Sequence, residues 1–469
     1  MEKYDLIVIG SGPAGEKAAV KAAYFGHRVA LIEKENLCGG AGVNTGTLPS
    51  KTLKETSLYL SGKSDKGLYG IDRNVNKEAS ITDFMYRKNW IVQTEAQEVY
   101  DNLKRHKVSL YFGTASFEDF HKIRISGKTE TLIEGKYIII ASGSYPFHPP
   151  HIPFDHQRVH DSDTILNITR FPHSIAVMGA GVIGCEYATI FSTMGAKVYL
   201  LNRSDKILTF IDKQIVDSFF RSMRNDGIEL LFNKDTLSIT TPKNASDLLD
   251  IKLSTGESIQ ADMFLFAAGR NGNVRELKLE KLGIKVTNRE TIEVNKNYQT
   301  SVPHIYAVGD VIGFPALAST SMDQGRVAVS HIYHTHDIEE IARIIPYGIY
   351  TIPEISTAGI NEEEAKKEKL NYGIGIARYL DLPRGKILGA NEEGKLKLIF
   401  TKEDLVIKGV HIIGNLATEL IHEGVSLIQH QRTLNYVIGK VYNYPTLHDL
   451  YKYAAYDGLS LLAGHKVKP

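Results

Sequence analysis

Residues 5–15 read DLIVIGSGPAG, and the architecture can be predicted outward from this stretch. An apolar run ends at Gly10, the pattern Gly10-x-Gly12-x-x-Gly15 follows, and an Ala-rich stretch comes next. A second apolar run, RVALI, leads to Glu33. This order predicts a strand, a glycine turn, a helix and a second strand. Because such a turn lets the backbone approach a pyrophosphate and points the positive helix end at it, we expect a dinucleotide site here.

The same pattern returns in the middle of the chain. The apolar segment SIAVM at 174–178 runs into Gly179-x-Gly181-x-x-Gly184, and after a helical stretch the segment KVYLL leads to Asn202. In both units 18 residues separate the last glycine of the turn from the residue that ends the second strand. The repeat predicts two dinucleotide-binding units in one chain.

The residues that end the two second strands differ, and the difference bears on the choice of nucleotide. Glu33 is a carboxylate, which accepts hydrogen bonds from the two hydroxyls of an adenosine ribose. A carboxylate about 4 Å from a 2′-phosphate would repel it by about 4 kcal/mol at an effective dielectric constant of about 20. Asn202 removes that repulsion, and Arg203 with Lys206 can pair with the phosphate. We therefore expect the second site to accept both NADH and NADPH, unless Asn202 only ends its strand and Arg203 is solvated.

The composition excludes several classes of protein. The 469 residues include 55 Lys and Arg and 54 Asp and Glu, which gives a net charge of +1. A chain with so little net charge has no overall positive potential that would attract nucleic acid or an anionic membrane. No apolar run approaches the roughly 20 residues of a membrane span, and because the strand pattern begins almost at the first residue, we expect no leader before it. Two cysteines exclude a disulfide scaffold and suit a reducing compartment, so we expect a cytoplasmic protein. His331, His334 and His336 lie close together, but no Cys or carboxylate cluster accompanies them, so no metal site is expected.

Further strand-to-glycine segments complete the pattern of the first two units. They are YIIIASGS at 137–144, MFLFAAGR at 263–270 and IYAVGD at 305–310. The tail alternates apolar and polar residues in KLKLIF and GVHII, between helical stretches, which is typical of a mixed α+β domain. The fold class we expect is α/β, with two Rossmann-like dinucleotide-binding domains and a C-terminal α+β domain. The predicted boundaries divide the chain into 1–150 with 273–345, then 151–272, and finally 346–469.

Several motifs in fixed order resemble one known group of proteins. These are GSGPAG, CGGAGVNTGTLPSK at 38–51, GAGVIGCEYA at 179–188, YAVGDV at 306–311 and NYPTL at 443–447. Together they resemble the flavoprotein disulfide reductase superfamily over nearly the whole chain, and the most similar branch is that of the soluble pyridine nucleotide transhydrogenases. The resemblance implies FAD as cofactor in the first domain, NAD(H) or NADP(H) as substrates in the second, and a homodimer formed through the third.

The chain departs from the superfamily where a redox-active disulfide is expected. Members carry two cysteines after the first unit and a histidine near the C-terminus that serves as their acid–base partner. Here Gly42, Thr47 and Tyr444 occupy these positions, while Cys38 and Cys185 lie elsewhere. Both thiols and their base are missing together, although the nucleotide motifs remain. The departure implies chemistry that stops at the flavin and passes electrons to another nicotinamide nucleotide, a quinone, a dye or oxygen.

The superfamily's residue roles carry over where the residues match. Lys51 would lie by flavin N5, where a cation stabilises charge on the reduced ring, and Glu186 would pair with Lys51 and guide the nicotinamide. These two are the expected catalytic residues. Asp310 would bond the ribitol chain, Gly143 would pack against the first cofactor, and Ala318 would lie near the ring. The full set of expected cofactor-binding residues is Gly10, Gly12, Pro13, Ala14, Gly15, Glu33, Lys34, Gly40, Lys51, Gly143, Asp310, Ala318, Gly179, Gly181, Gly184, Asn202, Arg203 and Gly269.

Three functions stay open at this point. The first is FAD-dependent transhydrogenation between NADPH or NADH and the opposite oxidised nucleotide, which the lost dithiol and the dual-use second site both favour. The second is an NAD(P)H dehydrogenase or diaphorase that reduces a quinone or another small acceptor. The third is a flavin- and nucleotide-binding sensor or subunit without turnover, for which Gly42 is the best argument.

Tyrosines crowd the C-terminal segment. In the superfamily this segment reaches across a dimer to the partner's flavin, so we expect aromatic packing at a homodimer interface. Tyr444 as a proton donor to a quinone or a nucleotide is the alternative. The residues concerned are Tyr442, Tyr444, Tyr451, Tyr453 and Tyr456.

Overall fold

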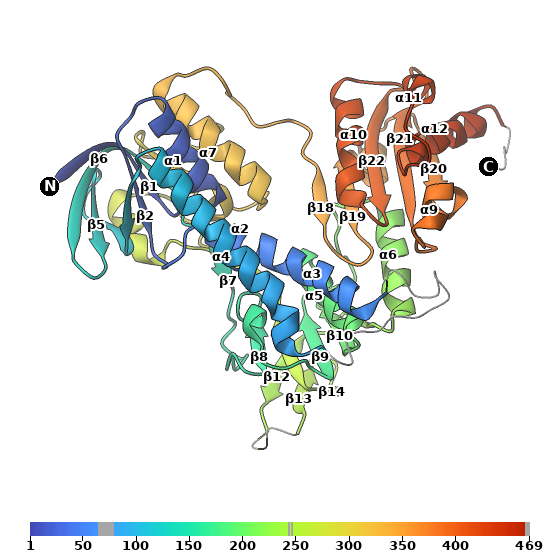
Figure 1. The fold of residues 1–469 in the computed structure, drawn as a ribbon, viewed down its shortest axis with the longest axis horizontal. Coiled ribbons are helices and arrows are strands. Elements are labelled where there is room, and N and C mark those ends of the chain that lie inside the picture. The colour runs from blue at the N-terminus through green and yellow to red at the C-terminus, as the bar shows by residue number, and fades with distance from the viewer. Residues whose placement is uncertain (64–78, 243, 245–246, 465–469) are drawn as a thin grey trace.

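The fold is α/β, as the sequence predicts, and it contains three large sheets (Figure 1). The computed structural model describes residues 1–63, 79–242, 244 and 247–464. In Figure 1 the first sheet lies beside the N-terminus, the second is drawn in green at the lower centre, and the third is orange to red beside the C-terminus. No helix among these residues is long and apolar enough to cross a membrane.

The first sheet has seven strands in the order β3-β2-β1-β6-β5-β4, with β17 also paired to β6. Its centre is parallel, and Leu6, Ile7 and Val8 of β1 are fully buried, which explains the uninterrupted apolar run. The strands are β1 (Glu2–Ile9), β2 (Val29–Glu33), β3 (Ser109–Phe112), β4 (Thr114–Phe117), β5 (Lys122–Ser126), β6 (Thr131–Ile140) and β17 (Ile305–Ala307). The helices of this part are α1 (Pro13–Tyr24), α2 (Gly40–Asn44), α3 (Thr47–Ser61), α4 (Ile81–Arg105) and α7 (Ala318–Tyr333).

The second sheet repeats the arrangement with five parallel strands in the order β11-β10-β9-β15-β8. A small antiparallel sheet, β12-β13-β14, adjoins it in sequence and packs against it through one apolar cluster. The strands are β8 (Val159–Asp161), β9 (Ser174–Met178), β10 (Lys197–Asn202), β11 (Glu229–Phe232), β12 (Thr236–Thr240), β13 (Leu249–Leu253), β14 (Ser258–Ala261) and β15 (Met263–Phe266). The helices are α5 (Val182–Thr193) and α6 (Lys213–Asn225).

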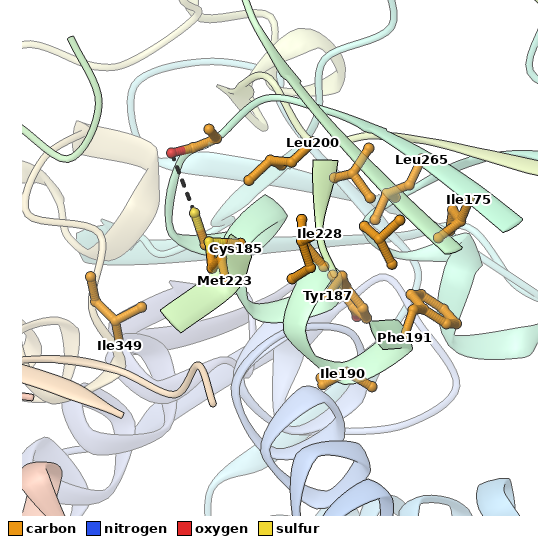
Figure 2. Packing of buried hydrophobic residues seen from close by; sticks show 14 of the residues in the cluster. Ile175, Cys185, Tyr187, Ile190, Phe191, Leu200, Met223, Ile228, Leu265 and Ile349 are labelled. Atoms are coloured by element: carbon orange, nitrogen blue, oxygen red, sulfur yellow. Dashed lines mark hydrogen bonds between the residues drawn. The ribbon is translucent and has the colours of Figure 1, made fainter. Parts of the chain in front are cut away.

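The core of the second unit contains Cys185. Figure 2 shows this side chain of α5 among aliphatic and aromatic residues, where its thiol donates to the carbonyl oxygen of Ala180 at 3.5 Å. Burial raises the pKa of the Cys185 thiol far above its usual value. A fully buried thiol that stays protonated behaves as a small apolar side chain. Cys185 therefore has a packing role, and it does not pair with Cys38, since both cysteines are free.

The third sheet is antiparallel, in the order β18-β19-β22-β21-β20. Its strands are β18 (Tyr347–Ile349), β19 (Ile355–Gly359), β20 (Tyr372–Arg378), β21 (Lys395–Thr401) and β22 (Ile407–Ile413). Its helices are α8 (Glu362–Lys367), α9 (Pro383–Ile387), α10 (Ala417–Gln429), α11 (Leu434–Gly439) and α12 (Asp449–Leu462). The short 3₁₀ helices of the chain are η1 (Thr164–Asn167), η2 (Arg275–Leu277), η3 (Leu279–Leu282), η4 (Gly309–Ile312) and η5 (Tyr379–Asp381).

The chain passes between the first two sheets through a two-stranded ladder of β7 (Ser144–Pro146) and β16 (Arg270–Gly272). This ladder lies close to the predicted boundaries near 150 and 272. The boundaries themselves, with the one near 346, stay predictions.

One tyrosine of the C-terminal cluster has a different role from the one predicted. Tyr451 is fully buried, donates to the carbonyl oxygen of Leu420 at 2.7 Å and accepts the N–H of Gly424 at 3.0 Å. These contacts lie within one chain, so Tyr451 anchors α12 on α10 and is not part of an exposed interface. Tyr444, Tyr453 and Tyr456 are exposed, as an interface role requires.

A buried ion cluster joins the second and third sheets. The ammonium of Lys397 on β21 is fully buried and contacts Asp212 Oδ1 and Oδ2 at 2.8 and 2.9 Å, and it also contacts Glu362. Burial alone would raise the pKa of Asp212, but the charge and hydrogen bonds of Lys397 and the backbone N–H of Glu362 lower it below its usual value. His411 donates through Nε2 to the carbonyl oxygen of Ile360 at 2.9 Å and is fully buried. Because burial lowers the pKa of His411, this ring stays neutral in the folded protein.

Acid should destabilise this cluster through His411. The unfolded chain takes up a proton below about pH 6.5, whereas the buried ring resists it, so folding stability falls as the pH falls. The expected loss is about 1.4 kcal/mol per pH unit between the two pKa values. Thermal unfolding across this range measures it, and His411→Gln should flatten the dependence. His430→Gln, at an exposed histidine, is the matched control; an equal effect of both substitutions would contradict the prediction.

Candidate functional site

Both glycine turns open into one cavity of about 1740 Å³. Residues from all three large sheets line it, so the cavity lies where the three parts of the chain meet. Of the residues that the sequence predicts for the site, only Gly15 and Gly184 do not line it. Those that do are Gly10, Gly12, Pro13, Ala14, Glu33, Lys34, Gly40, Lys51, Gly143, Gly179, Gly181, Glu186, Asn202, Arg203, Gly269, Asp310 and Ala318.

Gly15 and Gly184 act on the shape of the turns. A Cβ on Gly15 would lie 1.9 Å from the carbonyl oxygen of Gly10, and one on Gly184 would lie 1.8 Å from that of Gly179. The third glycine of each turn is therefore needed so that the helix can pack closely on the strand. The structure thus gives these two glycines a role in the shape of the turns, and their direct contact with a cofactor stays a prediction.

The two turns hold the residues that end the second strands in equivalent ways. Glu33 Oε2 accepts the backbone N–H of Ser11 at 2.9 Å, and Asn202 Oδ1 accepts that of Ala180 at 3.0 Å. Ser11 and Ala180 each follow the first glycine of their turn. The strand-end side chain is thus fixed beside the start of the helix in both units. The charge differs, since Glu33 is a carboxylate and Asn202 is an amide. The second atom of each side chain differs too: Glu33 Oε1 accepts the backbone N–H of Glu35, whereas Asn202 Nδ2 donates to the carbonyl oxygen of Ser204, both at 2.8 Å.

Lys51 and Glu186 form the ion pair that the sequence predicts. Lys51 on α3 contacts Glu186 on α5, with Nζ at 2.9 Å from Oε1 and 2.8 Å from Oε2. The Glu186 side chain is only 4% exposed, whereas that of Lys51 is 24% exposed. Glu186 also accepts the backbone N–H of Tyr350 at 3.0 Å and the hydroxyl of Ser50 at 3.4 Å. These contacts satisfy the buried carboxylate of Glu186 and fix it in place, so that it holds the ammonium of Lys51 at the cavity wall.

Tyr350 is a cavity residue that sequence reasoning missed. Its ring lies beneath the ammonium of Lys51, with Nζ 4.9 Å from the ring centroid, and burial raises the pKa of its hydroxyl. The residue comes from the C-terminal part of the chain, between β18 and β19. It lies in the segment GIYTIPEIS at 348–356, and nothing in the sequence indicated that it would meet Lys51.

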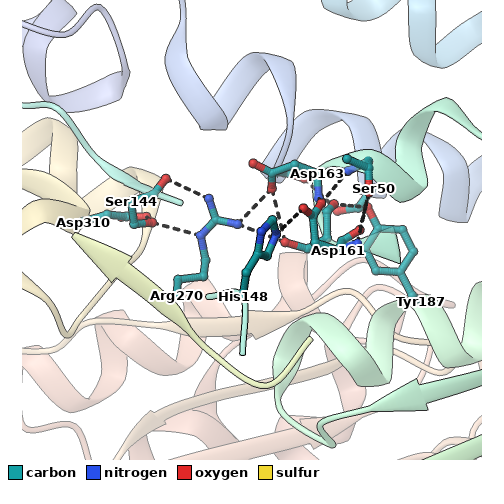
Figure 3. Close-up of polar contacts among 11 residues, drawn as sticks. Ser50, Ser144, His148, Asp161, Asp163, Tyr187, Arg270 and Asp310 are labelled. Carbon is teal, nitrogen blue, oxygen red and sulfur yellow. Dashed lines mark hydrogen bonds and ion pairs between the residues drawn. The ribbon is translucent and has the colours of Figure 1, made fainter. Parts of the chain in front are cut away.

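Arg270 was also missed, and it links the first two sheets across the cavity. Figure 3 shows its guanidinium between two groups: Nε donates to the hydroxyl of Ser144 at 2.9 Å, and a terminal nitrogen contacts Asp163 at 2.9 Å. The same Ser144 hydroxyl donates to Asp310 at 3.0 Å. Asp310 is therefore positioned by a chain of contacts that reaches the second sheet.

A second acidic residue of this region pairs with a histidine. Asp161 lies 2.7 Å from Nε2 of His148 (Figure 3). Burial alone would raise the pKa of Asp161, but the backbone N–H of Thr164 and the ring of His148 lower it. The carboxylate that results helps to hold η1 at the edge of the second sheet.

No thiol is available at the cavity. Gly42 and Thr47 line it, whereas neither Cys38 nor Cys185 does. Burial raises the pKa of the Cys38 thiol to about 11, so it is protonated at neutral pH. Gly42, which stands where the superfamily has a cysteine, packs closely against Pro13. A Cβ on Gly42 would lie 2.7 Å from Cγ of Pro13, so any side chain at this position would require a shift of the structure. In the part of the chain that the structure describes, no group of three or more His, Cys, Asp or Glu side chains could hold a metal ion.

Comparison with known proteins decides the family. Residues 4–325 match the family described as pyridine nucleotide-disulphide oxidoreductase. The chain belongs to this family. Residues 345–455 match the dimerisation domain described for the same family. The predicted resemblance to the flavoprotein disulfide reductases and the predicted fold class are therefore confirmed.

Relatives in this family match nearly the whole chain. The soluble pyridine nucleotide transhydrogenase of Mycobacterium bovis is 40% identical over 460 residues, which cover 97% of each chain. That of Sodalis glossinidius is 38% identical over 465 residues and 98% of each chain. Among solved structures, the HOCl-induced flavoprotein disulfide reductase RclA from Escherichia coli is similar with a TM-score of 0.86 at 25% identity, over 98% of this chain and 100% of that one.

The residues at the first turn fit a flavin dinucleotide. The N-terminus of α1 has no side-chain cap, so its first backbone N–H groups are available to a pyrophosphate. A Cβ on Gly12 would meet its first neighbouring atom only at 3.7 Å, and one on Gly143 would meet none within 4 Å. Ser142 Oγ and Asn44 Oδ1 are buried without a hydrogen-bond partner among the described residues, and both residues line the cavity. Such atoms favour a polar ligand that completes their bonding.

Proposed function

We propose that this protein is a FAD-dependent NAD(P)+ transhydrogenase that moves a hydride from NADPH or NADH to the oxidised form of the other nucleotide. The names of the relatives from Mycobacterium bovis and Sodalis glossinidius support the proposal. The observation that carries it is the cavity itself, which both glycine turns line and from which the two cysteines are absent. A cavity with two dinucleotide-binding turns and no thiol suits a reaction whose substrates and products are all nicotinamide nucleotides.

The chain's own residues would bind and orient the two kinds of nucleotide. When bound, FAD supplies a ring that accepts a hydride from one nicotinamide and returns it to another. Glu33 binds ribose hydroxyls of the FAD adenosine, and Asp310, oriented through Ser144, binds its ribitol chain. The N-terminus of α5, which has no side-chain cap, binds the pyrophosphate of the nicotinamide nucleotide. Lys51, held by Glu186, places a fixed positive charge where negative charge develops during the reaction.

One assay tests the proposal against its alternatives. The purified holoenzyme is mixed with NADPH and thio-NAD+ under anaerobic conditions, and the absorbances of NADPH and reduced thio-NAD are followed together. Transhydrogenation predicts that one falls as the other rises, with equal amounts converted. The same preparation should not reduce lipoamide or glutathione disulfide, because no dithiol stands at the cavity.

The other results would contradict the proposal and identify a different function. If NADPH bleaches the flavin, no hydride reaches thio-NAD+ and a quinone reoxidises the flavin, the protein is an NAD(P)H dehydrogenase. Flavin that neither NADH nor NADPH bleaches indicates a sensor or subunit without turnover. Rapid disulfide reduction would overturn the argument from Gly42 and Thr47.

We further propose that the protein is a homodimer joined through its C-terminal part. This part matches the dimerisation domain of the family over residues 345–455. Large apolar side chains remain exposed there on the single chain, with Val441 at 93% and Tyr444 at 75%. Sedimentation of the holoenzyme should give twice the mass of one chain, and Tyr444→Glu should shift it toward the monomer. A wild-type protein that sediments as a monomer at micromolar concentration would contradict the assignment.

A further inference from the structure

The carboxyl ends of two neighbouring strands carry an unpredicted ion pair at the adenosine end of the second nucleotide site. Arg203 follows β10, and Asp235 follows β11, which pairs with β10 in parallel. Arg203 Nε lies 2.7 Å from Asp235 Oδ2. Arg203 lines the cavity but Asp235 does not, so the carboxylate reaches the guanidinium from outside the cavity.

Asp235 is held in place by its own surroundings. Its Oδ1 accepts the backbone N–H of Thr236 at 2.8 Å, and its backbone N–H donates to the hydroxyl of Ser254 at 3.0 Å. Its side chain is 30% exposed, against 56% for Arg203. The turn that leads into the small sheet β12-β13-β14 therefore presents a fixed carboxylate to a more exposed arginine.

We propose that Asp235 sets the nucleotide preference of the second site by offsetting the charge of Arg203, so that nucleotides with and without a 2′-phosphate are both accepted. This inference rests on the proposed function, because it concerns the nucleotides that the proposed reaction exchanges. An arginine alone beside the ribose favours a 2′-phosphate, and a carboxylate at the strand end, such as Glu33 in the first unit, rejects one. The second site has a neutral Asn202 and an Arg203 whose charge Asp235 partly offsets. Its preference for a 2′-phosphate is therefore expected to lie between these two cases.

Asp235 could instead only orient Arg203, and this competing interpretation predicts the opposite change in phosphate binding when the charge of Asp235 is removed. If Asp235 only aimed Arg203 at the phosphate, removing its charge would weaken phosphate binding. If Asp235 offsets the charge of Arg203, removing it strengthens phosphate binding, because the carboxylate also repels the phosphate directly. A substitution that removes the charge and keeps the hydrogen-bond acceptor separates the two.

The test is the binding of nucleotide fragments to the holoenzyme, in which FAD already fills the first site. Calorimetric titration with 2′,5′-ADP and with 5′-AMP is compared for the wild type and Asp235→Asn. The amide oxygen of the variant can still accept the N–H of Thr236, so the turn should persist, and thermal unfolding verifies this. The proposal predicts that Asp235→Asn lowers the Kd of 2′,5′-ADP about tenfold at low salt and leaves the Kd of 5′-AMP within about twofold.

Glu257→Gln is the matched control. Glu257 also belongs to the small sheet's turns and pairs with a cation, Lys234, but neither residue lines the cavity. This variant should leave both Kd values within about twofold of the wild type. Weaker binding of 2′,5′-ADP to Asp235→Asn, or equal changes for the two fragments, would overturn the inference. Because these are binding measurements, they are independent of the thio-NAD+ assay: failed hydride exchange with the predicted Kd changes would refute the proposed function alone.

Discussion

Replacing Lys51 with methionine should slow the reduction of the bound flavin by NADH about 100- to 1000-fold. Removing one fixed charge or hydrogen-bond donor from the place where charge develops commonly has an effect of about this size on an enzyme. Lys51 reaches the cavity wall through its contact with Glu186, and its ammonium also lies over the ring of Tyr350. Methionine keeps most of the length of the side chain and removes only the charge. Stopped-flow absorbance of the anaerobic holoenzyme measures the rate.

Lys63→Met provides a control with matched geometry. Lys63 lies two residues after the end of α3 and pairs with Asp226 of the second unit at 2.7 Å, as Lys51 on α3 pairs with Glu186. Lys63 does not line the cavity, so its loss should leave the rate within about twofold. A similar loss of rate in both variants would mean that the ion pairs serve only to join α3 to the second unit.

Glu186→Gln separates charge from positioning. The glutamine can still accept the N–H of Tyr350, so the local fold is retained, but Lys51 loses its counter-charge. If Lys51 acts through its charge, Glu186→Gln leaves the ammonium in the cavity and should slow the reaction less than Lys51→Met does. If Lys51 only holds Glu186 in place, the two variants should be equally slow, which would refute the assigned role.

The order of elements could be predicted from the sequence because the signals are local. The first turn, its helix and Glu33 lie within a short stretch, and a strand, a glycine turn and a helix each leave their own pattern in it. The equivalence of Glu33 and Asn202 followed from spacing alone, and both side chains accept a backbone N–H of their turn. Local chemistry and local structure agree in these units.

The missed residues share a different physical origin. Tyr350 reaches Lys51 from another part of the chain, Arg270 reaches Ser144 across 126 residues of sequence, and Asp235 reaches Arg203 from the neighbouring strand. Their positions depend on how the sheets pack against one another, and a single sequence carries no periodicity that reports such packing. Tyr451 shows the converse, since its aromatic neighbours in sequence suggested a surface although its hydroxyl is bonded inside the chain. Residues that adjust the charge at the cavity and the choice of nucleotide are thus harder to predict from sequence than the glycine turns that bind the nucleotide.

Gly181→Ala should weaken nicotinamide nucleotide binding about 10- to 100-fold while the protein remains folded. Gly181 has φ −79°, which alanine adopts without strain, and a Cβ there would meet no protein atom within 4 Å. Gly181 lines the cavity at the N-terminus of α5, so the added methyl group would occupy space that a pyrophosphate needs. Losing a hydrogen bond between a backbone N–H and a charged group costs about 1.5–3 kcal/mol, which is about 10- to 100-fold in Kd.

Two further alanine variants show whether the effect arises from the cradle. Gly184→Ala should also weaken binding, but by distorting the turn, since its Cβ would lie 1.8 Å from the carbonyl oxygen of Gly179. Unlike Gly181→Ala, it should lower the unfolding temperature. Gly439→Ala also adds a methyl group where no atom lies within 4 Å, but at an exposed position in the C-terminal part, and it should change neither property. Titration of each holoenzyme with NADH, flavin content and thermal unfolding provide the readouts. If Gly181→Ala binds NADH like the wild type, the second turn does not hold a pyrophosphate. That result would contradict the proposal that two dinucleotide-binding turns serve one cavity, on which the argument for transhydrogenation depends.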